Sequence, residues 1–176
     1  LGNTKWLELN ATGAEQTNSN RWNNTSPTSS VFTVNVDSSV NGSSYTYVAY
    51  CFSDIKGYSK LGGFRGNGNA DGEFVYTGFS PAFVLLKNAD ETEQWWIFDN
   101  KRNGYAGNFR YYSLNPNSGS NEGTNSADAN HIDFLSNGFK LRTTAQQLNG
   151  SGDDFIYMAF AESPFVNSNS VPTNAR

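Results

Sequence analysis

One stretch of this chain occurs twice, and the duplication constrains the fold more than any other feature of the sequence. The first copy runs from about Leu1 to Asp54 and the second from about Phe109 to Glu162. The clearest matched segments are Val31–Val34 with Gly138–Leu141, Asn41–Ser43 with Asn149–Ser151, and Tyr45–Tyr50 with Phe155–Phe160. The offset between the copies grows along the chain, as loop insertions in a shared fold would produce. Two similar segments at a domain-sized spacing indicate tandem duplication.

The second copy follows a segment that the first copy lacks, which runs from Phe74 to Asp99. We therefore expect residues 1–56 to be the C-terminal half of a first repeat unit. Residues 57–176 are then a complete second repeat unit with a C-terminal tail. The alternative is that residues 1–176 form one fused sandwich domain. On the first interpretation the chain begins inside a unit, so Leu1 is not expected to be a natural translational start.

Short runs of aromatic and β-branched residues, each bounded by Gly, Asn, Ser, Asp or Pro, predict strands. The predicted strands are Trp6–Leu9, Val31–Val36, Ser44–Phe52, Phe74–Thr77, Ala82–Lys87, Trp95–Asp99, Ile132–Leu135, Gly138–Thr143 and Asp154–Ala161. No segment has the pattern of an amphipathic helix. Hydrophobic residues make up only 36% of the chain, but aromatic residues make up 15% and can supply a core. The sequence therefore predicts an all-β fold, an antiparallel β-sandwich or jelly roll with long polar loops and little helix.

Charge and residue usage argue against several classes of function. The formal net charge of -4 disfavours nucleic acid as a partner, because phosphate binding needs clustered Lys and Arg. No apolar run approaches the ~20 residues that membrane insertion needs. Cys51 is the single cysteine and lies in a predicted strand, so we expect a buried core thiol. His131 is the single histidine and cannot supply a zinc site alone. No catalytic set stands out, and we predict that the protein is not an enzyme.

Several motifs resemble those of a known family. They are Leu1–Asn10, Tyr47–Phe52, Gly57–Gly62, Asp71–Phe79, Pro81–Lys87, Asp99–Arg102 and Val171–Arg176. Nearly the whole chain resembles a repeat domain of tail-fibre, head-fibre and other structural proteins of marine bacteriophages. The resemblance implies a concanavalin A-like, laminin-G-like sandwich. It also implies a virion-surface protein, made in the bacterial cytoplasm, that contacts other virion proteins and self-associates as a homo-oligomer such as a trimer.

On this resemblance we expect the module to bind host-surface glycan. Aromatic rings stack on sugar faces, while Asn, Asp and Arg side chains hydrogen-bond sugar hydroxyls. The candidate ligand-binding residues are Trp96, Asp99, Asn100, Arg102 and Tyr105, with Trp22 and Asn24 in the equivalent loop of the first copy. The alternative for these residues is structural, with Trp96 in the core and Asp99–Arg102 forming a turn and an ion pair. No cofactor is expected, and if a lectin-like calcium site exists its candidate carboxylates are Asp71, Asp153 and Asp154.

Two other functions stay open. The chain can be a purely structural fibre or capsid-assembly module without a ligand. In that case residues 1–54 would pack against a half-unit supplied by upstream chain or by a neighbouring subunit through strand addition. A glycan depolymerase is the less favoured alternative, because glycoside hydrolysis needs two carboxylates about 5 to 10 Å apart in a groove. The candidate carboxylates Glu8, Asp99, Asp133 and Glu162 show no marked pairing in the sequence.

Overall fold

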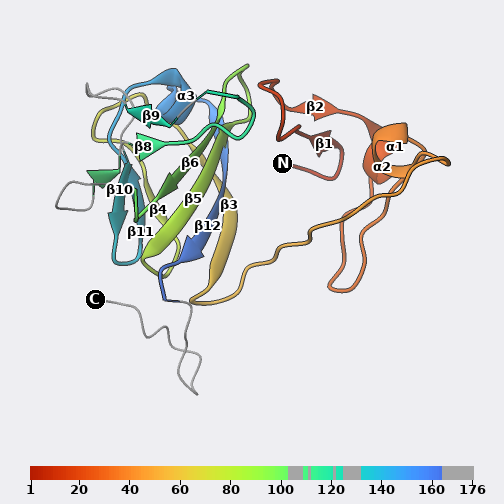
Figure 1. Ribbon diagram of the computed structural model, residues 1–176, viewed down its shortest axis with the longest axis horizontal. Coiled ribbons are helices and arrows are strands. Elements are labelled where there is room, and N and C mark those ends of the chain that lie inside the picture. Colours follow the sequence, from red (N-terminus) through yellow and green to blue (C-terminus); the bar gives the residue numbers. More distant parts are fainter. Residues whose placement is uncertain (103–108, 111, 121, 125–131, 164–176) are drawn as a thin grey trace. The chain divides into compact units, whose positions relative to one another are not determined.

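The structure is a computed structural model that describes residues 1–102, 109–110, 112–120, 122–124 and 132–163. The chain divides into two compact units, which are considered separately below (Figure 1). The first unit comprises Leu1–Glu8 and Glu15–Phe52, and the second comprises Leu9–Ala14 and Ser53–Arg176. The assignment of residues 1–56 to a half repeat, and of residues 57–176 to a complete one, stays an interpretation of the sequence duplication.

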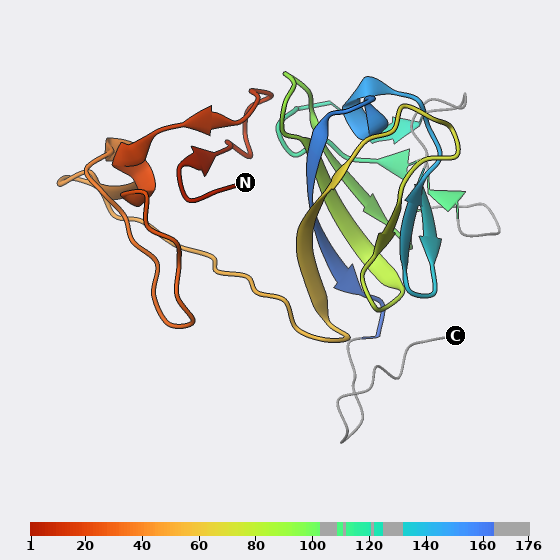
Figure 2. The same ribbon diagram turned by 180° about the vertical axis from the view of Figure 1, so that it is seen from behind.

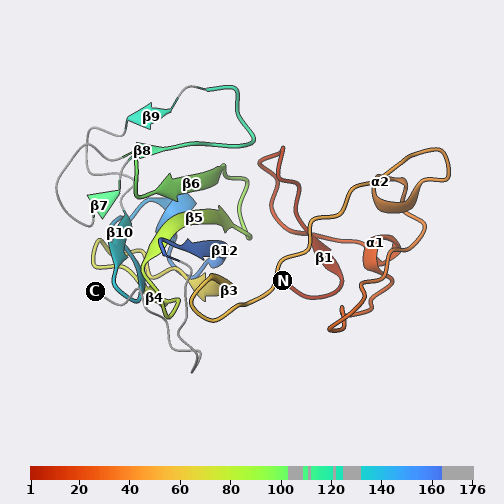
Figure 3. The ribbon, with the colours of Figure 1, turned by 60° about the horizontal axis from the view of Figure 1, so that its bottom comes forward.

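The second unit is built on two four-stranded antiparallel sheets. One sheet contains β4 (Phe74–Tyr76), β11 (Gly138–Leu141), β10 (Ile132–Leu135) and β7 (Phe109–Arg110), in that order. The other contains β3 (Ser59–Arg65), β12 (Asp154–Ala161), β5 (Pro81–Asn88) and β6 (Trp95–Asp99). Figure 3 shows β6, β5, β12 and β3 as one row of strands. The prediction of an antiparallel all-β sandwich with little helix is confirmed.

Side chains from the two sheets fill the space between them. In β12 the residues Phe155, Tyr157 and Ala159 are buried, while the residues between them are half-buried. This alternation is typical of a strand with one face on a core. The opposite sheet contributes Phe139 and Leu141 of β11, which are fully buried. The Phe139 ring meets the Tyr157 ring edge-on at a centroid distance of 5.3 Å, so aromatic packing joins the two sheets.

The remaining elements are short. The strands β1 (Lys5–Trp6) and β2 (Gln16–Thr17) pair in the first unit, and β8 (Tyr112–Ser113) pairs with β9 (Gly123–Thr124) in the second. Three one-turn helices are present among the described residues: α1 (Ser19–Trp22), α2 (Ser38–Asn41) and α3 (Gln146–Asn149). In Figure 1, α3 lies at one end of the sandwich, away from the start of β3.

The first unit is organised around Arg21 rather than around a core. The Arg21 guanidinium carbon lies 3.3 Å from the centroid of the Trp6 ring. The same side chain ion-pairs with Glu8 and with Asp37, each at 3.5 Å. Residues 1–52 are all described, and none of them is buried. This unit therefore depends on polar and cation–π contacts, which stabilise far less than a packed core.

Two predicted strands are wrong. Val31–Val36 and Ser44–Phe52 contain no strand, and Figure 2 shows the second segment as an extended trace that leads into β3. Cys51, expected as a core thiol, is exposed. The physical reason lies in pairing: the matched strands of the second copy, β11 and β12, pair with β4 and with β3 and β5. Residues 1–54 carry no matched copy of those partner strands.

Candidate functional site

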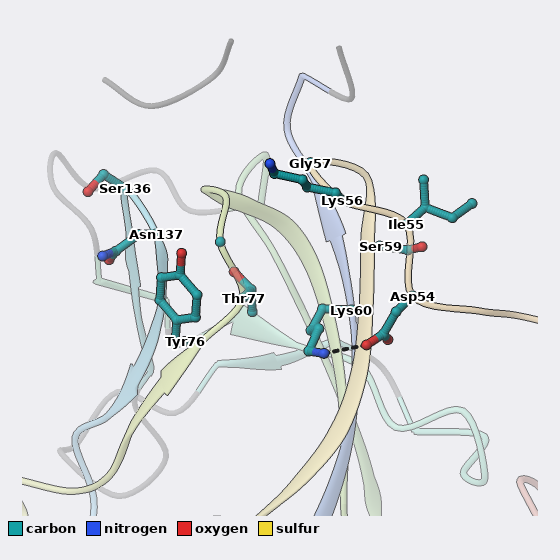
Figure 4. A pocket seen from close by; sticks show the side chains of 11 residues that line it. Asp54, Ile55, Lys56, Gly57, Ser59, Lys60, Tyr76, Thr77, Ser136 and Asn137 are labelled. Atoms are coloured by element: carbon teal, nitrogen blue, oxygen red, sulfur yellow. Dashed lines mark hydrogen bonds and ion pairs between the residues drawn. The ribbon is translucent and has the colours of Figure 1, made fainter. Parts of the chain in front are cut away.

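The second unit contains a pocket of about 600 Å³ at the end of the sandwich where β3 begins and β4 ends. Figure 4 shows the side chains around it. The lining residues are Asp54, Ile55, Lys56, Gly57, Ser59, Lys60, Tyr76, Thr77, Gly78, Ser136 and Asn137. They come from the turn before β3, from the end of β4 and from the turn between β10 and β11, so the two sheets supply opposite walls.

One wall is a compact turn closed by an ion pair. The backbone amide of Ser59 donates to the Ile55 carbonyl at 2.9 Å, and the amide of Ile55 donates back to Ser59 at 3.0 Å. Gly57 adopts φ 73°, a left-handed conformation that glycine adopts without strain. The Lys60 ammonium hydrogen-bonds and ion-pairs with the Asp54 carboxylate (Figure 4). This wall therefore presents both a cation and an anion at the rim of the pocket.

The ion pair shifts the ionisation of both of its members. Partial burial raises the pKa of Asp54, but the Lys60 hydrogen bond, the Leu61 amide and the Lys60 charge outweigh that effect. The pKa of Asp54 is therefore below its ordinary value of 3.8. The hydrogen bond to Asp54 raises the pKa of Lys60 above 10.5. Both groups are charged at neutral pH.

The other wall is formed by Tyr76 and a tight hairpin turn. Tyr76 and Gly138 are register partners, and Ser136 and Asn137 link β10 to β11. The amides of Thr77 and Gly78 donate to the Asn137 carbonyl at 3.0 and 3.1 Å, which holds the end of β4 against this turn. The Tyr76 ring is 64% exposed and lies between Asn137 and Thr77 in Figure 4. The Ser136 and Asn137 side chains are exposed beside it.

This arrangement combines an exposed aromatic face with a ring of hydrogen-bonding groups. The Tyr76 ring offers an apolar surface, while Asn137, Ser136 and Lys56 offer donors and acceptors with little burial. A shallow pocket of this kind suits a neutral polyhydroxyl ligand, whose ring hydrogens pack on the aromatic face. Among the described residues, the lining contains two ammonium groups, those of Lys56 and Lys60, and one carboxylate, that of Asp54, so acidic groups on a ligand are also tolerated.

The aromatic member of the predicted patch is a core residue. Trp96 is 8% exposed, belongs to the main core cluster and stacks on Phe98 at a centroid distance of 6.3 Å. Its indole ring is therefore not on the surface that a sugar would reach. This placement corresponds to the structural alternative for Trp96.

The polar members of that patch form a turn at the end of β6. The Asp99 Oδ1 atom accepts hydrogen bonds from the amides of Lys101 and Arg102, both at 2.9 Å. The Asp99 Oδ2 atom lies 2.5 Å from Arg102 Nε, and Arg102 Nη1 lies 3.4 Å from Glu122 Oε1. The amide of Asn100 donates to Ala82 at 2.9 Å. The structure brings Asp99, Asn100 and Arg102 together, and their role in glycan binding stays a prediction.

The other predicted ligand residues lie elsewhere. Trp22 and Asn24 belong to the first unit, where Trp22 Nε1 donates to the Lys5 carbonyl at 3.2 Å. Asn24 has φ 49°, and its carbonyl accepts a hydrogen bond from Asn3 at 2.6 Å. Tyr105 lies outside the described residues. The described members of the predicted patch are therefore divided between the two units, with Trp22 and Asn24 in the first and Trp96, Asp99, Asn100 and Arg102 in the second.

The candidate calcium ligands also have protein partners. The hydrogen bond and charge of Lys140 lower the pKa of Asp71, which ion-pairs with Lys140 at 2.9 Å and with Arg142 at 2.8 Å. The Asp153 carboxylate accepts hydrogen bonds from Asn88 and Gln146. Asp154 is exposed. Within the described ranges no three His, Cys, Asp or Glu side chains gather as a metal site.

The carboxylates considered for hydrolysis are likewise paired with cations. Asp133 lies 2.7 Å from Arg142 Nε, and Glu162 lies 3.4 Å from Lys101 Nζ. Glu8 and Asp99 pair with Arg21 and Arg102. Each of the four carboxylates therefore has a cationic side chain as an ion-pair partner.

Sequence reasoning missed Tyr76, Asn137 and Lys60 as site residues. A local sequence signal exists for two of them. Asn137-Gly138 is typical of a hairpin turn, and Tyr76 lies on a short strand in which exposed and buried residues alternate. The pairing of β4 with β11, which places Tyr76 beside Asn137, is a long-range contact that neither segment specifies alone.

Comparisons with known proteins add a family and nothing more specific. A family model described as a domain of unknown function (DUF7483) matches residues 1–164. No curated protein and no solved structure matches the chain. Among the described residues, the helices are all too short and too polar to cross a bilayer.

Proposed function

We propose that this chain, which belongs to the DUF7483 family of domains of unknown function, is a surface module of a bacteriophage virion and binds host-surface glycan. The observation that supports this role best is the pocket beside β3 and β4, with the exposed Tyr76 ring among uncharged polar and basic side chains. Binding, rather than catalysis, suits a pocket in which Asp54, the one carboxylate that the described residues contribute to the lining, is paired with Lys60. In this proposal the sandwich is of the concanavalin A-like or jelly-roll type and belongs to a tail or head fibre.

The first test measures binding to an array of bacterial surface oligosaccharides. Loss of the Tyr76 ring in Tyr76→Ala is expected to weaken binding by about tenfold or more, because ring stacking and its buried area contribute over about 1 kcal/mol. Tyr76→Phe is expected to keep most of the affinity. Phe74→Ala is the matched control, since Phe74 is an exposed ring on the same strand but does not line the pocket. Equal binding by Tyr76→Ala and Phe74→Ala would show that the pocket beside Tyr76 is not the glycan-binding site. Absence of binding by the parent chain as well would contradict glycan binding itself.

An assembly role without a ligand is the second candidate. It is favoured by the exposed apolar side chains of residues 31–52, which suit contacts between protein chains better than contacts with sugar. Light scattering on the purified chain separates the two candidates. A trimer or larger homo-oligomer that binds no array component supports assembly alone, whereas a monomer that binds through Tyr76 supports a self-contained adhesion module.

A further inference from the structure

The two copies of the repeat form the same local elements. Each copy has a short antiparallel ladder, which β1 forms with β2 in the first copy and β8 forms with β9 in the second. The helix α2 corresponds to α3, because Asn41 and Asn149 are matched positions and each ends its helix. The glycines that follow, Gly42 and Gly150, share an extended conformation with ψ 135° and 136°. The duplication seen in the sequence is therefore also present in the backbone.

The side chains matched to β11 and β12 differ in burial between the two copies. In β11 the side chains of Phe139 and Leu141 are fully buried, whereas the matched Phe32 and Val34 are exposed. The same holds for β12, whose buried Tyr157 corresponds to the exposed Tyr47. Tyr50, the counterpart of Phe160, is 82% exposed. The first copy thus keeps the apolar pattern of two sandwich strands without burying it.

The same difference appears at a buried hydrogen-bonding side chain. In the second copy the Asn149 amide lies 3.0 Å from Asn67 Oδ1 and 2.9 Å from the Asn69 carbonyl, so it holds the loop that joins β3 to β4. Asn149 is fully buried. The matched Asn41 is exposed. Asn67 and Asn69 lie between the two copies of the repeat, and residues 1–54 contain no matched loop for Asn41 to hold.

We propose that Val31–Val34 and Tyr45–Cys51, which match β11 and β12 but form no strand, dock a partner polypeptide with the strand pattern of residues 59–99. In the second unit that pattern supplies β3 and β5 on the two sides of β12, and β4 beside β11. The partner accordingly places one strand on each side of Tyr45–Cys51 and a third beside Val31–Val34. Backbone hydrogen bonds give affinity, and the alternating rings of Tyr45 and Tyr47 give the register.

The partner is a different segment rather than a second copy of these residues. Each chain carries two segments of the β11–β12 type but one segment of the β3–β6 type, and that one is already paired within its own unit. A second copy of the chain could therefore not supply the partner strands, because its own segment of the β3–β6 type is already paired within its own second unit. This inference is independent of glycan binding, because the pocket lies wholly in the second unit.

The test supplies such a segment to the full chain. A duplicate of residues 55–102 is fused before Leu1 through a flexible Gly/Ser linker, in the order that the second unit uses. Cys51, the single cysteine, then serves as a reporter, because its counterpart Ala161 packs partly against the core. We expect thiol labelling of Cys51 to slow by at least about tenfold, and amide exchange in residues 45–52 to slow by about 100-fold.

A control fusion separates docking from mere tethering. It carries Val84→Asp and Leu86→Asp in the added duplicate only, since both positions are fully buried in the original sandwich. The control is expected to leave Cys51 labelling and amide exchange as in the parent chain. The proposal is overturned if the intact fusion protects residues 45–52 no better than the control. It is also overturned if the parent chain forms an oligomer in which residues 45–52 are already protected from exchange, because these residues would then pair with a second copy of the chain.

Discussion

Residues 31–52 and residues 138–161 are similar in sequence and differ in structure. Both contain a one-turn helix followed by a glycine in the same conformation, but only the second forms the strands β11 and β12. A helical turn and a short ladder need only neighbouring residues, whereas a sheet strand needs hydrogen-bonding partners and a surface on which to bury its side chains. This sequence pattern therefore allows a strand to form, but the strand forms only where neighbouring strands are available to pair with it.

The largest expected effect comes from one matched pair of phenylalanines. Phe139→Ala removes a fully buried ring between the two sheets and is expected to lower the free energy of unfolding by about 3–5 kcal/mol. Phe32→Ala, at the matched position of the first copy, is expected to change it by less than about 0.5 kcal/mol, because the Phe32 ring is already 46% exposed. Urea denaturation of both variants measures the contrast. Similar losses in the two variants would show that Phe32 is buried in solution.

The next prediction concerns the matched asparagines. Asn149→Ala leaves the Asn67 amide and the Thr143 carbonyl, which lie 3.0 and 2.8 Å from the Asn149 side chain, without that partner. The expected loss in the free energy of unfolding is about 2–3 kcal/mol, since buried polar groups lose their hydrogen bonds. Asn41→Ala is the control and is expected to be nearly neutral. Thermal denaturation of the two variants tests this, and an equally large loss for Asn41→Ala would contradict the comparison.

Much of the sandwich could be predicted from the sequence, because its strands carry their own pattern. β6, β10 and β12 begin and end where the runs of apolar and β-branched residues and the flanking turn residues indicate. β3 could not be predicted, because Gly62 and Gly63 weaken its strand propensity. A Cβ at Gly62 would lie 2.9 Å from the Tyr157 hydroxyl oxygen, so the glycine is explained only by its partner on β12.

The candidate site was harder to predict for the same reason. Asp99 and Arg102 are close in sequence, and their ion pair follows from that spacing. Tyr76 and Asn137 are far apart in sequence, and only the register of β4 with β11 brings them to one pocket. Residue type alone also misplaced Trp96, because a tryptophan on a strand suits a core as well as a sugar-binding surface.

A third prediction tests whether the first unit is held by polar contacts alone. Arg21→Ala removes the guanidinium group from the Trp6 ring and from the carboxylates of Glu8 and Asp37. The expected cost is about 1–2 kcal/mol of local stability, because a cation–π contact on a half-buried ring has that size. Acrylamide quenching of tryptophan fluorescence is expected to increase, while the melting temperature of the sandwich stays unchanged. A lowered melting temperature would mean that the two units unfold together.

The smallest expected effect is a pH dependence of stability that arises from the Asp54–Lys60 pair. This pair is a surface contact of the second unit, in contrast to the core residues tested above. The pKa of Asp54 is lowered on folding, so this carboxylate contributes stability above its unfolded value of 3.8 and loses that contribution as the pH falls through the lower folded value. The pKa of Lys60 is raised, so its contribution is present below 10.5 and is lost as the pH rises through the higher folded value. Both side chains are more than one third exposed, so solvent screening limits the pair to less than about 1 kcal/mol.

The variant Asp54→Asn makes that contribution measurable. It is expected to be slightly less stable than the parent chain at neutral pH, and the difference is expected to disappear in acid well below pH 3.8, where Asp54 itself is protonated. Urea denaturation at both pH values provides the measurement, and added salt is expected to reduce the neutral-pH difference. Asparagine keeps an Oδ1 atom that can accept the hydrogen bond that the Leu61 amide donates to Asp54 at 2.8 Å, so the comparison isolates the charge of the side chain. A difference that persists unchanged in acid would show that this charge does not stabilise the start of β3, and the ion pair would then contribute only to the charge at the rim of the pocket.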